Sequence, residues 1–161
     1  MSVSVQWWWK LRARLGYSVA RWMLQWPALV RQPRLWQWME GQFSRQANLG
    51  DTQAQSFYGH VLLFRGQGLG ARNEGRRLLH LAAQAGDAKA AYQLGVLCLQ
   101  GTPEHAADAA QTADWWTRAA AVGHPLAARK LADLYRKGGP GLPADAAAAR
   151  QMDQRATELG L

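Results

Sequence analysis

Side chains that commonly do catalysis or bind metals are sparse in this chain of 161 residues. It has one cysteine, Cys98, and four histidines, His60, His80, His105 and His124. No two histidines stand four residues apart, and none is paired with the cysteine at the spacing of a metal site. We therefore expect no catalytic residues, no metal and no cofactor, and we interpret His124 as a capping or turn residue.

Two glycine-rich segments, at residues 66–70 and 138–141, could in principle cradle a phosphate. Neither continues into the Gly-Lys-Ser/Thr sequence of a phosphate-binding loop, and each follows an expected helix rather than a strand. We interpret both as turns between helices. The single cysteine allows no disulfide within the chain, and Cys98, set in an expected helix, is predicted to be a small buried residue.

The clearest pattern is a repeat that must position whatever site the chain has. Glycines recur at positions 50, 86, 123 and 160, that is at spacings of 36, 37 and 37 residues. A fixed period of this length is typical of stacked helix pairs. We expect three units, at about residues 50–86, 87–123 and 124–161, after a different N-terminal region at residues 1–49.

Each unit is predicted to contain two helices. The first opens after one of these glycines with a capping residue, namely Asp51, Asp87 or His124. A break rich in glycine and proline separates it from the second helix. Small residues at matching positions of the first helix indicate close packing between helices: Ala54 and Gly59, Ala90 and Gly95, Ala127 and Ala132.

These features resemble the Sel1-like repeat, a relative of the tetratricopeptide repeat. The resemblance rests on residues 90–95 in a first helix, 139–145 in a loop and 115–123 in a second helix, and it covers about residues 50–160. The first unit departs from it, with Arg72 where the family usually has Asp, and the loop of the second unit matches worst. The resemblance implies an all-α solenoid of three Sel1-like helix–turn–helix repeats with an N-terminal amphipathic helical extension.

The N-terminal region differs from the repeats in composition. Seven of the nine tryptophans lie within the first 38 residues. Residues 1–49 also hold seven Lys or Arg and a single acid, Glu40, for a net charge of +6, so most of the formal charge of +8 lies there. Lys10, Arg12, Arg14 and Arg21 interrupt the apolar residues, so we expect neither a transmembrane helix nor a signal peptide.

One face of the first expected helix, which should end near Pro27, is apolar, and basic residues lie opposite it. The apolar residues, which we call the stripe, are Trp8, Leu11, Leu15, Val19, Trp22 and Trp26, and the opposite basic residues are Lys10, Arg14 and Arg21. A second helix is expected from Pro33 to Ala47. The stripe could cap the open end of the repeats, bind an anionic membrane surface or dock a partner helix.

The first helices of stacked units usually line a concave binding face. The residues predicted for it are Gln53, Ser56, His60, Phe64, Lys89, Tyr92, Val96, Arg129, Asp133 and Arg136. This face is polar with aromatic anchors and is basic toward the C-terminal end, which suits a peptide or helix of some acidic character.

The sequence thus predicts a non-catalytic adaptor or regulatory subunit that binds another protein or peptide. The alternative is a peripheral membrane protein whose N-terminal helix binds anionic lipid while the repeats hold a partner. We do not expect nucleic acid as a partner, because the basic residues interleaved with tryptophan are not accompanied by a nucleic-acid-binding motif. We expect a cytoplasmic protein, in the alternative on the inner face of the membrane.

Overall fold

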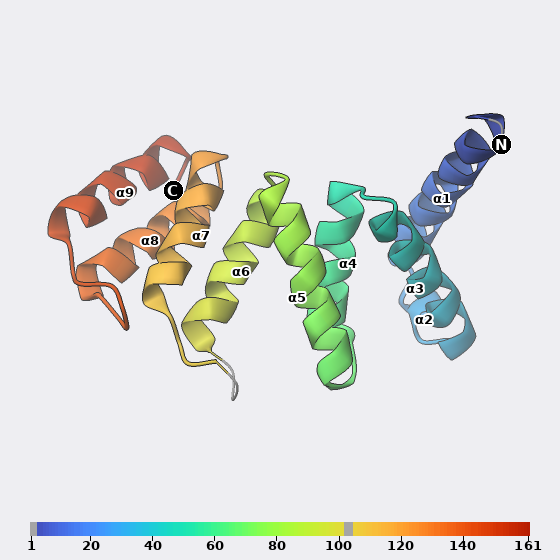
Figure 1. Ribbon diagram of the computed structural model, residues 1–161, viewed down its shortest axis with the longest axis horizontal. Coiled ribbons are helices and arrows are strands. Elements are labelled where there is room, and N and C mark those ends of the chain that lie inside the picture. The colour runs from blue at the N-terminus through green and yellow to red at the C-terminus, as the bar shows by residue number, and fades with distance from the viewer. Residues whose placement is uncertain (1–2, 102–104) are drawn as a thin grey trace.

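The computed structural model describes residues 3–101 and 105–161, with side chains from residue 8 onward. Within these ranges it contains nine helices and no strand, which confirms the predicted all-α fold. The helices are stacked one after another along the long axis of the molecule (Figure 1). The helices are α1 (Val3–Met23), α2 (Pro27–Val30), α3 (Pro33–Asn48), α4 (Thr52–Arg65), α5 (Gly68–Gln84), α6 (Ala88–Gln100), α7 (Ala109–Ala121), α8 (Pro125–Lys137) and α9 (Ala146–Glu158).

The three predicted helix–turn–helix repeats are the pairs α4–α5, α6–α7 and α8–α9. The first helix of each pair opens with the same capping contact. Asp51 and Asp87 each accept a hydrogen bond from the backbone N–H three residues further on, at 2.8 and 2.7 Å. His124 does the same through Nδ1, at 3.1 Å, which confirms its predicted capping role.

The small residues of the first helices let the second helices approach closely. A Cβ atom added at Gly59 would lie 2.8 Å from the Cγ of Leu79, and one at Gly95 would lie 2.4 Å from the ring of Trp116. Ala132, at the same position of the third pair, is fully buried. Any larger side chain at these positions would force the two helices of a pair apart.

The connection inside the first pair differs from the other two. Asp108 and Asp145 cap α7 and α9 with their side chains, whereas Gln67, before α5, makes no such bond. The matching position of the first unit is Arg72, whose side chain has no acceptor for a helix N-terminus. The helix therefore starts a turn earlier, at Gly68, and α5 has 17 residues where α7 and α9 have 13.

The loop of the second unit, which we expected to be the poorest match, follows the third at its described ends. Gly101 and Gly138 have φ angles of 66° and 68°. After each loop, the backbone N–H of the capping aspartate donates to a carbonyl of the first helix, Cys98 in one case (3.0 Å) and Tyr135 in the other (2.8 Å). The irregular loop is that of the first unit.

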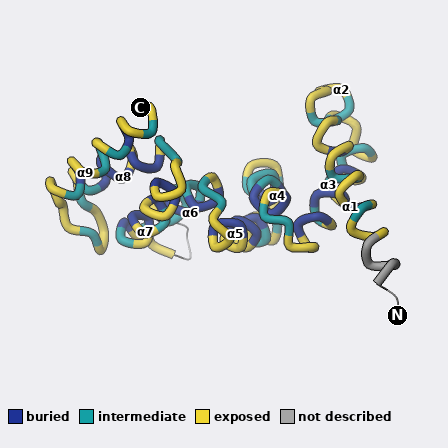
Figure 2. Tube along the Cα trace, turned by 90° about the horizontal axis from the view of Figure 1, so that it is seen from above, coloured by how far each residue is buried: buried dark blue, intermediate teal, exposed yellow. Residues whose placement is uncertain are grey.

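The N-terminal helices continue the stack. Phe43 and Met39 of α3 are fully buried in a cluster that also contains Ala20 of α1 and Tyr58 of α4. A second cluster runs from α5 to α8 and includes Trp116, which is 3% exposed. Buried residues lie where neighbouring helices meet along the whole row (Figure 2).

Candidate interaction surfaces

Among the described residues, no group of three or more His, Cys, Asp or Glu side chains could hold a metal ion. Cys98 is half-buried, and its thiol donates to Oε1 of Gln111 at 2.9 Å. Burial raises the pKa of this thiol above its ordinary value. A thiol with a raised pKa carries little thiolate at neutral pH and is a weak nucleophile, so this contact fits a packing role.

Three residues predicted for the concave face lie in contacts inside the stack. The hydroxyl of Ser56, which is buried, donates to Oδ1 of Asp87 at 2.9 Å. The half-buried ring of Tyr92 stacks on those of Trp116 and His124, with centroids 5.9 and 4.7 Å apart. Val96 is half-buried against the core. These residues join helices of the stack, and Ser56 also lines the hollow described below.

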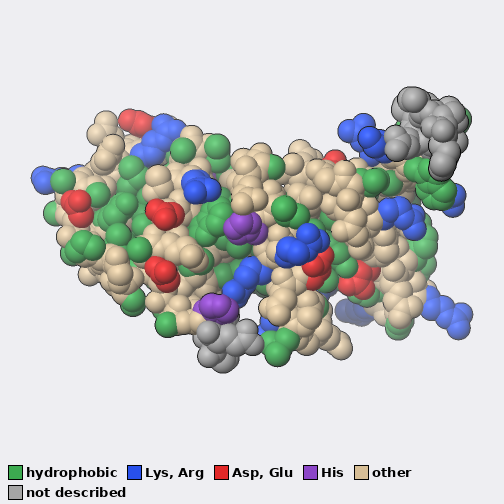
Figure 3. Space-filling model, viewed as in Figure 1, with side chains coloured by type: hydrophobic (Ala, Val, Ile, Leu, Met, Phe, Trp, Pro, Cys, Tyr) green, Lys and Arg blue, Asp and Glu red, His purple; other side chains and the backbone are tan. Residues whose placement is uncertain are grey.

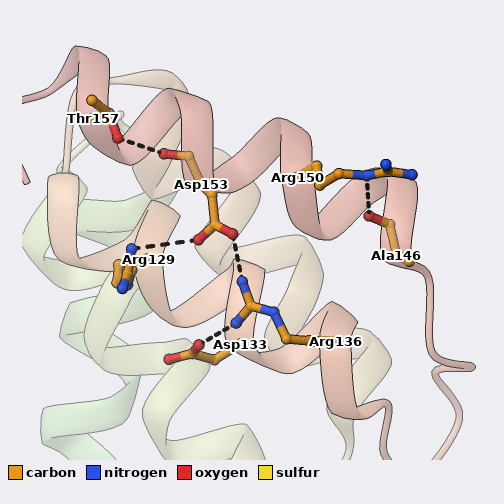
Figure 4. Close-up of polar contacts among 7 residues, drawn as sticks. All are labelled: Arg129, Asp133, Arg136, Ala146, Arg150, Asp153 and Thr157. Carbon is orange, nitrogen blue, oxygen red and sulfur yellow. Dashed lines mark hydrogen bonds and ion pairs between the residues drawn. The ribbon is translucent and has the colours of Figure 1, made fainter.

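The contacts of Ser56 and Tyr92 follow the repeat. Each residue stands five positions after the cap of its own unit and contacts the cap of the next one, Asp87 or His124. The equivalent residue of the third unit is Arg129. It lies on α8, and its guanidinium is directed instead toward α9 of its own unit (Figure 4).

The predicted basic part of the concave face is an ion-pair cluster. Arg129 Nη1 lies 3.6 Å from Oδ1 of Asp153, and Arg136 pairs both with Asp133 (2.7 Å) and with Asp153 (Figure 4). Asp153 occupies the place that Trp116 holds one unit earlier, 37 positions before it. The two positive charges are thus balanced by two carboxylates, Asp133 on α8 itself and Asp153 on α9, and the sequence alone did not indicate the pairing with α9.

The remaining predicted residues lie near a hollow between α1, α4 and α6. Gln53, His60 and Lys89 line it, together with Arg21 of α1, and its volume is about 500 Å³. Phe64, 70% exposed, stacks on His60 with centroids 6.4 Å apart and extends this surface.

Two cations of this hollow have no ion-pair partner among the described residues, although Arg21 donates to the hydroxyl of Tyr17 at 3.4 Å. Neither Arg21 nor Lys89 forms an ion pair with any described residue; Arg21 instead lies over the ring of Phe57, 5.4 Å from its centroid. The carboxylate of Asp87 is the one acidic group among the residues that line the hollow. Its Oδ1 already accepts hydrogen bonds from Ser56 and from the capped backbone.

The stripe is not the face of α1 that packs against α3. Its members are half-buried or exposed, with exposed fractions of 60% for Leu15 and 57% for Trp22. The packed face contains small residues, with Ala13 and Ala20 almost fully buried and Gly16 between them, and Tyr17, whose ring lies 5.9 Å from that of Phe43. A Cβ atom on Gly16 would lie 2.3 Å from Oε1 of Gln42, so the glycine leaves room for this side-chain amide of α3.

A groove of about 650 Å³ runs between α1 and α3 on the side of the stripe. Its apolar lining comes from both helices: Trp8, Trp9, Leu11, Leu15, Val19 and Trp38. Arg12 and Arg45 also line it, and Arg45 donates to Oε1 of Gln42 at 3.2 Å. No acidic side chain is among the lining residues.

The basic residues expected to support the stripe face elsewhere. Lys10 and Arg14 line a separate hollow with Gln46 and Asp51, next to the start of α4. Arg21 lies over Phe57 of α4. Within the described residues, no helix is long and apolar enough to cross a membrane.

A model of the Sel1 repeat matches residues 52–87, 88–124 and 125–161, which together are more than half of the chain. The chain belongs to the Sel1 repeat family. Sel1 repeats in general mediate contacts between proteins and form a non-catalytic scaffold. A search of curated proteins finds no match to this sequence.

Two solved structures resemble this Sel1 repeat protein. A Sel1 repeat protein from Oxalobacter formigenes is 28% identical, with a TM-score of 0.62 over 73% of this chain and 88% of the other. A protective antigen of uropathogenic Escherichia coli strains, described as having an SLR fold, is 22% identical, with a TM-score of 0.67 over 76% of this chain. The match spans 26% of that antigen's length, and it shows the fold alone.

Sequence reasoning missed several residues of these surfaces. Arg12, Trp38 and Arg45 were absent from the predicted sites, because they become neighbours only when α1 packs on α3. The small residues Ala13 and Gly16 gave a usable signal, since they share a helix face that must approach another backbone. Asp153 gave another, because a charge falls there in register with buried Trp116.

Proposed function

We propose that this Sel1 repeat protein is a non-catalytic adaptor that holds a partner protein at the hollow between α1, α4 and α6. The observation that carries the proposal is the pair of cations, Arg21 and Lys89, that face the hollow without an ion pair among the described residues. The carboxylate of Asp87 lines the same hollow but forms no ion pair with either cation, and its Oδ1 accepts from Ser56 and from the backbone.

The chemistry of the hollow favours an extended acidic segment. Carboxylates of the partner would pair with Lys89 and Arg21, while the exposed ring of Phe64 offers an apolar anchor at the rim. This reassigns the binding surface from the C-terminal to the N-terminal half of the predicted concave face. The arginines of α8 are paired with Asp153 and have less charge to offer.

Charge reversal tests the adaptor proposal. The variant Arg21→Glu/Lys89→Glu is compared with Arg34→Glu/Arg72→Glu, which makes the same change of net charge at two exposed arginines outside the hollow. Proteins captured by the wild type are quantified by mass spectrometry. We expect a set of acidic partners to be lost by the first variant and kept by the second. Equal retention by both variants would exclude the hollow as the binding site.

Attachment to a membrane surface is a second candidate function, favoured by the stripe that α1 leaves exposed. It concerns a different part of the molecule from the hollow, so the two functions are compatible. The test is flotation of the full-length protein with anionic vesicles in a density gradient at low ionic strength. Flotation that high salt reverses supports this function, because the attraction of exposed charges is screened.

A further inference from the structure

We propose that the groove between α1 and α3 is a docking surface for an anionic bilayer, with lipid phosphates held by Arg12 and Arg45 and the surrounding indole rings at headgroup level. This inference rests on the second candidate function and specifies which side of the N-terminal helices meets the lipid. It assigns the contact to different cations from those that the sequence suggested.

The apolar part of the surface is large and continuous with the groove. Trp8, Trp9 and Trp38 line it and are exposed by 64%, 60% and 44%. Trp22, which belongs to the same stripe, lies 14 residues beyond Trp8, so the stripe is about 21 Å long at 1.5 Å per residue. Trp26 extends it past the helix, with its ring centroid 6.0 Å from that of Trp22.

An exposed apolar surface of this extent is unfavourable in water. Contiguous apolar patches of this kind mark binding sites, since soluble proteins rarely leave them uncovered. Tryptophan is enriched at the interface between lipid and water, where its ring lies among headgroups and its N–H can still donate a hydrogen bond. An amphipathic helix that lies in this interface buries its apolar face to a shallow depth, which matches one exposed side of α1.

The groove is positively charged, and its arginines can bind anions from outside the protein. Arg12 and Arg45 line it, and no carboxylate does. Glu40, the one acid in residues 1–49, interacts with Tyr58 of α4, away from the groove. Gln42, 8% exposed, accepts a hydrogen bond from Arg45 and so helps to hold the guanidinium at the groove wall. Arginine binds phosphate oxygens in a planar, two-pronged geometry, which suits lipid headgroups.

The orientation of the protein on the bilayer follows from the basic residues of α1 that do not line the groove. Lys10 and Arg14 line a hollow beside Asp51, and Arg21 lies over Phe57 of α4, so all three face the repeats. A bilayer on the groove side therefore leaves the hollow that contains Lys89 open to a partner. A partner helix could fill the groove, but the Trp22–Trp26 pair, which is not among the groove's lining residues, would stay exposed.

Two charge-matched variants test this assignment. Each variant removes two positive charges. The groove variant, Arg12→Gln/Arg45→Gln, removes one charge from α1 and one from α3. The control variant, Lys10→Gln/Arg14→Gln, removes both charges from α1. Binding of the full-length protein is measured by flotation with vesicles of equimolar phosphatidylcholine and phosphatidylserine. A basic residue near such a surface contributes about 1 kcal/mol, so the groove variant should bind roughly thirtyfold more weakly, and the other less than about threefold.

A second readout tests the tryptophans directly. Lipids with brominated acyl chains should quench the emission of the wild type, and Trp9→Ser/Trp38→Ser should lose much of that quenching while melting as the wild type does. Both positions are exposed, so the fold does not depend on them.

Three results would overturn the docking proposal. Equal losses in the two charge variants would mean that lipid attracts the net charge and that the groove has no special part. An absence of flotation and quenching would remove the second candidate function as well. Saturable binding of an acidic amphipathic helical peptide to the groove, with no binding to vesicles, would assign the surface to a protein partner. The adaptor proposal is independent of all three, because it depends on Arg21→Glu/Lys89→Glu.

Discussion

The two ends of the helical stack differ in how they meet solvent. At the α1 end, Leu15 and Trp22 are more than half exposed, and Arg12 forms no ion pair with any described residue. At the α9 end, the position that holds Trp116 one unit earlier holds Asp153, and its carboxylate pairs with Arg129. The surface colours reflect this at the α9 end, where acidic and basic groups lie near one another (Figure 3).

This difference shows that apolar exposure is not a necessary result of stacking helix pairs. Units of a solenoid bury their faces against neighbours, and an outward face needs polar residues to stay soluble. The third unit meets this need with Asp153, Arg129 and Arg136. The N-terminal helices do not, although α1 already packs on α3 through Ala13 and Ala20. Their exposed stripe is therefore better explained by binding than by architecture.

The largest expected effect is that of a Leu→Asp substitution at a buried position, which we compare with the same substitution at an exposed position. Leu94→Asp puts a carboxylate at a position only 4% exposed, and we expect it to lower the free energy of unfolding by about 3–5 kcal/mol. Leu15→Asp, at a position 60% exposed, should change it by less than about 0.5 kcal/mol. Chemical denaturation measures both. A large loss with Leu15→Asp would show that the stripe is structural, and would remove the contrast between the two regions.

The sequence predicted the repeats well because their signals are local. A glycine, a cap and a small residue recur in every unit, and each acts on its immediate neighbours in the helix pair. The face of α1 was harder to assign, since Trp and Leu dominate a hydrophobic periodicity while Ala13, Gly16 and Ala20 contribute little to it. The structure packs the small residues, together with Tyr17, against α3 and leaves most of the stripe exposed.

The contacts made by the residues of the predicted binding face could not be deduced from the sequence, for a related reason. Ser56 and Tyr92 have the polar or aromatic character of binding residues, yet they contact the cap of the following unit. Such contacts depend on the rotation between units, which no single helix encodes. Arg129 carried the same ambiguity, and its pairing with Asp153 required the position of α9.

A smaller effect is expected at the contact between α1 and α3. Gly16→Val places side-chain atoms where Oε1 of Gln42 lies, so this amide must turn away and lose its bond to Arg45, and we expect a loss of about 0.5–1.5 kcal/mol and a disturbed groove. Gly41→Ala is the control, because a Cβ atom there meets nothing within 4 Å and α3 should gain about 0.5–1 kcal/mol from it. Thermal melting compares the two. If both variants were equally stable, the amide of Gln42 would not lie against Gly16 as described.

A substitution in the ion-pair cluster at the α9 end should lower stability less than the substitutions above. Asp153→Asn removes the carboxylate that pairs with Arg129 and Arg136. The side chains of these arginines are 56% and 50% exposed, respectively. Pairs this open to solvent contribute little to stability and are screened by salt. We expect a slightly lower melting temperature at low salt and no difference from the wild type at high salt. A large loss that persists in high salt would mean that the cluster is a structural core of the third unit.

The smallest effect concerns the cap that distinguishes the third unit. Asp51 and Asp87 cap the first two units, and His124 caps the third. Burial lowers the pKa of His124 below its ordinary value of 6.5. Below pH 6.5 the unfolded chain therefore binds a proton that the folded chain does not, so stability should fall as pH falls through that value and toward the folded pKa.

The variant His124→Asp, which gives the third unit the cap of the other two, isolates this contribution. A carboxylate cap stays ionised from about pH 8 to about pH 5.5, so the variant should lack this loss of stability while its other titrating groups behave as in the wild type. The measurement is the difference in unfolding free energy between the two proteins across that range. We expect it to be flat above pH 6.5 and to shift in favour of the variant below. A difference that does not change with pH would mean that His124 keeps its ordinary pKa and that its cap is independent of protonation.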